Sequence, residues 1–147
     1  MALGEAQWQE LVALFAPAAS AAQERQSIAM AIARMEQMVG GQAGTSGDLP
    51  RNNGDGGRIG QLDCIAESRN ATTYLHALQD AGLLRWHSVA APAKRQRWVF
   101  SIHHTAVIEE TATHRQFAVD SWYQGNGVAP LVQPLDDWRR ARNEPAR

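Results

Sequence analysis

Three residues of this 147-residue chain have the side-chain types of a cysteine nucleophile and its general base, namely Cys64, His103 and Asp120. A thiol reacts as its thiolate, which a neighbouring imidazolium or the N-terminus of a helix favours. A carboxylate that holds one ring nitrogen of the histidine fixes its tautomer and leaves the other nitrogen for the sulfur. We therefore expect Cys64 to attack, His103 to transfer the proton and Asp120 to orient the histidine.

Cys64, the only cysteine, follows a glycine-rich segment. Residues 40–60 hold eight of the twelve glycines, which predicts a long irregular loop. Asp63 is a suitable cap for a helix that begins there and ends before Gly82. Gln61 is the candidate side-chain donor to an oxyanion, beside the backbone N–H of Cys64, and its alternative role is to cap the same helix.

The choice between His103 and His104 depends on a predicted hairpin. Alternating apolar residues predict strands over 83–90, which contains His87, and over 97–109, 115–123 and 131–134. A two-residue turn at 112–113 pairs Thr105 with Asp120 and places His103 on the same side as Asp120. A three-residue turn shifts the register by one residue and selects His104 instead.

The segments before the cysteine have the apolar spacing of helices, over 5–15 and about 18–38, with Glu24 off the apolar stripe of the second. Pro17 and the glycines at 40–41 are expected to end them. A last short helix that contains Trp138 is expected to begin at the acidic pair 136–137. Helices followed by strands predict one α+β domain over residues 1–147, with a helical part at 1–39, a glycine-rich loop at 40–60 and an antiparallel sheet.

Composition narrows the classes of partner. The 14 basic and 15 acidic side chains leave a formal net charge of −1, which gives no electrostatic reason to expect nucleic acid or an anionic membrane as a partner. No stretch approaches the roughly 18 apolar residues of a membrane span, and residues 1–18 lack the pattern of a signal peptide. One cysteine forms no intramolecular disulfide. We expect a cytoplasmic protein with no nucleic-acid or membrane partner, and export without a signal stays open.

Three short segments together resemble a known group of enzymes. They are Asp63-Cys64 at a helix start, then His-His-Thr-Ala-Val at 103–107 and Ala-Val-Asp-Ser-Trp at 118–122 on successive strands. This order resembles the papain-like fold in its transglutaminase-like branch, which includes bacterial transglutaminase-like cysteine proteinases and arylamine acetyltransferases. Asp63-Cys64 also resembles the motif start of the NlpC-type cell-wall amidases. The resemblance implies a Cys-His-Asp triad acting on the amide bond of a peptide or small amide, with no cofactor and no metal.

Two other interpretations stay open. Cys64 lies on the apolar stripe of its helix, so the three residues can serve structure in a catalytically inactive binding or accessory module. Cys64, His103 and Asp120 are also conceivable zinc ligands, although a single cysteine cannot build a multi-cysteine zinc site.

Overall fold

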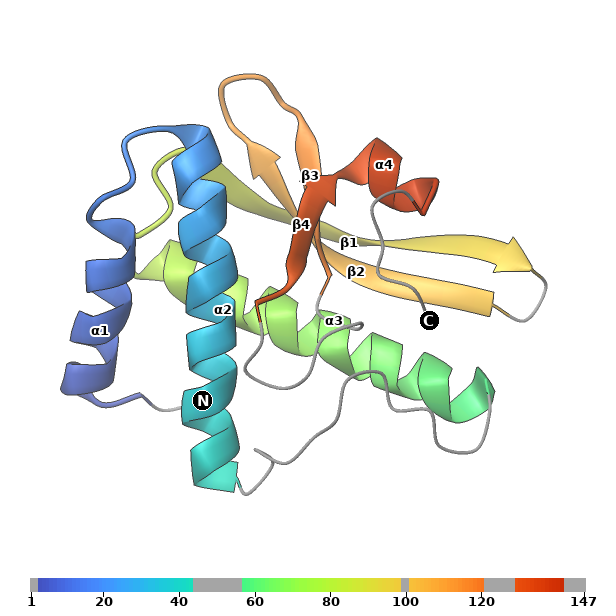
Figure 1. Ribbon diagram of the computed structural model, residues 1–147, viewed down its shortest axis with the longest axis horizontal. Coiled ribbons are helices and arrows are strands. Elements are labelled where there is room, and N and C mark those ends of the chain that lie inside the picture. Colours follow the sequence, from blue (N-terminus) through green and yellow to red (C-terminus); the bar gives the residue numbers. More distant parts are fainter. Residues whose placement is uncertain (1–2, 44–56, 99–100, 121–128, 142–147) are drawn as a thin grey trace.

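The computed structural model describes residues 3–43, 57–98, 101–120 and 129–141, without the side chains of 40–43, 57–65, 67, 97–98 and 101. Three long helices come first, α1 (Glu5–Phe15), α2 (Ala21–Ala43) and α3 (Gly57–Asp80). Four strands and a short helix follow, β1 (His87–Trp98), β2 (Ser101–Glu110), β3 (Gln116–Asp120), β4 (Leu131–Pro134) and α4 (Leu135–Arg139). Figure 1 shows the helices packed on one twisted sheet, which confirms the predicted α+β class.

The sheet is antiparallel and has the strand order β1-β2-β3-β4, so each strand pairs with its neighbours along the chain. Its two faces have different covers. On one face the sheet and the helices α1 to α3 share the main core, to which the sheet contributes Ala106, Ile108, Phe117 and Val119. On the other face Val107 and Ala118 pack under Leu135 and Trp138 of α4.

Helix α4 begins at Leu135, so the acidic pair 136–137 lies in its first turn and does not precede it. The end of α2 and the start of α3 also differ from the prediction. Helix α2 continues through Gly40 and Gly41 to Ala43. A glycine lowers the stability of a helix by only about 1 kcal/mol relative to alanine. The packing of earlier residues of α2, such as the fully buried Met35, stabilises the helix enough for it to continue through the two glycines. Helix α3 begins at Gly57, so Asp63 lies inside it and is not its cap. The predicted loop is therefore helical at 40–43 and 57–60, and its remainder at 44–56 lies outside the described residues.

Strand β1 is longer than predicted and begins later. Residues 83–86 precede it, and it runs through 91–96, which the prediction had left out, to Trp98. Its pairing with β2 shifts between Ala90 and Ala93, where Pro92 lies. Proline has no N–H to donate, so a strand tolerates it only at the edge of a sheet or at a bulge. Pro92 meets both conditions, because β1 is an edge strand and its register shifts at this point. The end of α3 agrees with the prediction, because Gly82 adopts φ 77° there.

No helix in the described part of the chain is both long and apolar enough to cross a membrane.

Candidate functional site

The hairpin β2–β3 has the register expected from a turn centred on residues 112–113. Ala106 pairs with Val119, and Ile108 pairs with Phe117. The chain reverses over 111–115, where His114 takes a positive φ of 62°. Because the register is the predicted one, Asp120 and His103 belong to the same face of the hairpin as Val107 and Ala118, which is the face that α4 covers.

His103 and Asp120 form a buried hydrogen bond on that face. Nε2 of His103 lies 2.8 Å from Oδ2 of Asp120, and only 6% and 2% of the two side chains is exposed. The same carboxylate oxygen accepts the indole N–H of Trp138 at 2.8 Å. The carboxylate thus holds the imidazole of His103 through Nε2 and fixes the orientation of its ring.

Helix α4 encloses this pair from above the sheet. The rings of Trp138 and His103 lie 5.7 Å apart between centroids, with an interplanar angle of 31°. The guanidinium of Arg95, which lies opposite His103 on β1, stacks 4.7 Å from the Trp138 ring and donates a hydrogen bond to the Trp138 carbonyl. Sequence reasoning placed Trp138 in a helix but gave it no part in the site, because its contact with Asp120 depends on how α4 folds back over the sheet.

His104 points to the opposite face of β2, since side chains alternate along a strand. It lies across from Lys94 on β1. Burial lowers the pKa of His104, and the basic side chains of His103, Lys94 and Arg69 around it lower that pKa further. Arg69 belongs to α3, so His104 is the histidine that faces that helix.

Cys64 and Gln61 both lie in the helical backbone of α3, and their side chains are outside the described residues. The helix begins at Gly57, two turns before Cys64, so the expected activation of the thiol by a helix N-terminus is wrong, because that effect fades within the first turn. Farther along α3, Leu75 and Leu78 pack with Ala106, on the sheet face opposite His103. The structure thus joins two of the three predicted catalytic residues, and the place of the sulfur stays a prediction.

A second buried polar cluster ties α2 to the start of β1, and the sequence did not reveal it. The carboxylate of Glu24 accepts the backbone N–H groups of Arg85 at 2.7 Å and Trp86 at 2.9 Å, and it lies 2.8 Å from Nδ1 of His87. Nε2 of His87 lies 3.2 Å from a guanidinium nitrogen of Arg25. A guanidinium only donates, so Nε2 accepts and the His87 proton sits on Nδ1.

Glu24 was expected off the apolar stripe, yet it is fully buried. Burial alone would raise the pKa of Glu24, but the hydrogen bonds from His87 and from the N–H groups of Arg85 and Trp86 outweigh burial and hold that pKa below its usual value. All three of these partners lie in the chain that enters β1, so the carboxylate serves as an anchor for that strand.

Comparisons with protein-family models, with curated proteins and with solved structures found no match to this chain. Among the described residues, no three His, Cys, Asp or Glu side chains gather where they would hold a metal ion. A zinc site that includes Cys64 involves a side chain outside those residues.

Proposed function

We propose that this protein is a cysteine-dependent hydrolase or acyl transferase that acts on an amide bond, on a papain-like fold of the transglutaminase-like type. The observation that supports the proposal is the buried hydrogen bond between His103 Nε2 and Asp120 Oδ2. A histidine held in this way has one defined orientation, which a general base needs.

In the proposed reaction, Nδ1 of His103 takes the thiol proton and the Cys64 sulfur attacks the carbonyl carbon of the amide. The backbone N–H of Cys64 and the side chain of Gln61 stabilise the tetrahedral oxyanion. The C–N bond then breaks, His103 gives its proton to the departing amine, and a thioester remains on Cys64. Water or a second amine attacks the thioester, its proton passes to His103, and the thiol is restored.

The reactivity of Cys64 tests the proposal directly. At pH 6 only about 0.3% of a free thiol with an ordinary pKa is thiolate. We expect iodoacetamide to alkylate Cys64 at pH 6 at least about tenfold faster than glutathione, as for a thiol paired with an imidazolium. His103→Gln is expected to abolish this excess and the matched variant His104→Gln to keep it. An excess that disappears only in His104→Gln would refute the assignment of the base, and no excess in the wild-type protein would refute the mechanism.

The packing of α3 favours one second candidate, a binding or accessory module without catalysis. Cys64 lies two turns inside α3, and this helix packs on the sheet face opposite His103. In that case the pair of His103 and Asp120 holds Trp138 and α4 on the sheet. The module predicts a thiol no more reactive than glutathione, and a His103→Gln variant that changes stability alone.

A further inference from the structure

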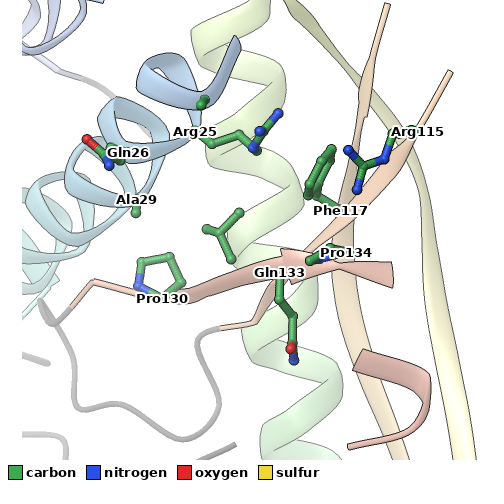
Figure 2. Close-up of a pocket in the computed structure, with 10 residues that line it drawn as sticks. Arg25, Gln26, Ala29, Arg115, Phe117, Pro130, Gln133 and Pro134 are labelled. Atoms are coloured by element: carbon green, nitrogen blue, oxygen red, sulfur yellow. The ribbon is translucent and has the colours of Figure 1, made fainter. Parts of the chain in front are cut away.

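A cavity lies between α2 and the strands β3 and β4, away from the site on the α4 face (Figure 2). Its volume is about 540 Å³, which is in the range of pockets that hold small molecules. The helix contributes small or polar residues, and the strands contribute an aromatic ring and apolar side chains. Those that bear on the argument are Ala22, Arg25, Ala29, Arg115, Phe117 and Val132.

Two guanidinium groups meet at the ring of Phe117. The central carbon of Arg25 lies 4.0 Å from the ring centroid and that of Arg115 lies 5.2 Å from it, and Figure 2 shows both side chains extended towards the ring. Among the residues that the structure describes, no acidic side chain lines the cavity. Two like charges near one buried ring, with no carboxylate in the lining, favour an anionic occupant.

The two arginines differ in their ion pairs. Arg25 donates to Glu110 at 2.8 Å. Among the described residues, the Arg115 guanidinium makes no ion pair. Its acidic neighbours in the hairpin are engaged elsewhere, since Glu110 also accepts a hydrogen bond from Thr113, and Glu109 accepts hydrogen bonds from Gln116 and His114. Of the two arginines at the cavity, Arg115 is therefore the one whose positive charge is available to a ligand.

We propose that this cavity binds a small organic carboxylate. The carboxylate accepts two parallel hydrogen bonds from Arg115, for which the planar guanidinium is matched. The apolar part of the ligand lies against Ala22, Ala29 and Val132. A single available cationic charge fits a monoanion better than a doubly charged phosphate ester, which would need Arg25 to leave Glu110.

This ligand site is independent of the proposed catalysis. Phe117 and Val132 pack with the helical side of the sheet, whereas His103 and Asp120 lie under α4 on the other side. A Cys64→Ala variant is thus expected to bind the carboxylate as the wild-type protein does. If the catalytic proposal is refuted, the proposal of a carboxylate site is not affected.

Three small molecules that share a phenyl ring and differ in their polar group test the proposal, namely benzoate, benzamide and phenyl phosphate. Each is titrated into the full-length protein while amide resonances are followed by NMR. We expect benzoate to bind with a Kd of roughly 1 mM and to shift the amides of Arg115, Phe117 and Val132. Benzamide, which has no charge, is expected to bind at least about tenfold more weakly, and phenyl phosphate is expected to bind no more tightly than benzoate.

The variant Arg115→Gln should weaken benzoate binding about tenfold, whereas Arg139→Gln, at an exposed position of α4, should leave it unchanged. Arg115 is exposed and its described side-chain contact is with the Phe117 ring, so the variant is expected to keep the wild-type spectrum elsewhere. Absent benzoate binding, equal binding of benzamide, or an unaffected Arg115→Gln variant would each overturn the proposal. Tighter binding of phenyl phosphate would overturn the preference for a carboxylate.

Discussion

Replacement of Glu24 by glutamine removes one charge from the buried anchor between α2 and β1 and nearly conserves its shape. The carboxylate accepts three hydrogen bonds, from the N–H groups of Arg85 and Trp86 and from His87 Nδ1. Glutamine keeps one oxygen, and its NH2 group must face at least one of these donors. The loss is at least one hydrogen bond to a charged acceptor, about 1.5–3 kcal/mol, and it leaves a buried N–H unsatisfied at a further cost of about 1–3 kcal/mol.

Glu24→Gln should therefore lower the free energy of unfolding by about 3–5 kcal/mol, and lower Tm by on the order of 10 °C for a chain of this length. Urea unfolding followed by circular dichroism at pH 7 measures the difference. The matched control is Glu10→Gln, which removes a carboxylate whose side chain is 45% exposed and pairs with Arg34. Its expected cost is below about 1 kcal/mol.

The pH dependence gives a second readout of the same anchor. The folded-state pKa of Glu24 is lowered from 4.5, so its stabilisation is complete above that value and is lost as pH falls through the lower folded-state pKa. The stability difference between the wild-type protein and Glu24→Gln should hence be constant from pH 7 to about pH 5 and shrink below pH 4.5. A difference that grows on acidification, or a Glu24→Gln cost no larger than that of Glu10→Gln, would refute this reasoning.

Two further substitutions test α4 and the end of α3. Trp138→Phe removes the N–H donor to Asp120 and part of a fully buried ring, so urea unfolding should show that the free energy of unfolding falls by about 2–4 kcal/mol. The control Trp8→Phe, at a partly buried position, should lower it by about 1 kcal/mol. Equal losses in the two variants would contradict the role given to the Trp138 indole. Gly82→Ala should cost about 1–2 kcal/mol through backbone strain alone, because φ is 77° and an added Cβ meets nothing within 4 Å. Gly4→Ala, at φ −73°, should cost less, and the reverse order of the two losses would count against strain at Gly82.

The hairpin was predictable because its information is local. Alternation along each strand and the length of one turn determine which residues pair, and together they indicated His103 rather than His104 as the partner of Asp120. The helical stripes were predictable for the same reason, since the buried positions Ile28, Ile32 and Leu75 recur at the helical period.

The rest of the site depends on contacts between distant parts of the chain. Glu24 and His87 are 63 residues apart, and no periodicity in either segment shows that a carboxylate beside an apolar stripe meets the start of a strand. Trp138 reaches Asp120 only because α4 folds back over the sheet. The start of α3 was misplaced for another reason, because Asp63 has the composition of a cap while the residues before it are also able to form a helix.

The order of the strands has a consequence for how this chain folds. Each strand pairs with the next along the chain, so the hairpin β2–β3 forms by closing a loop of about five residues. The contact between Glu24 and Arg85 closes 61 residues, and loop closure of that length costs about 2 kcal/mol more in chain entropy. The hairpin is therefore expected to form before α2 docks, and mutations in the hairpin to slow folding while Glu24→Gln mainly speeds unfolding.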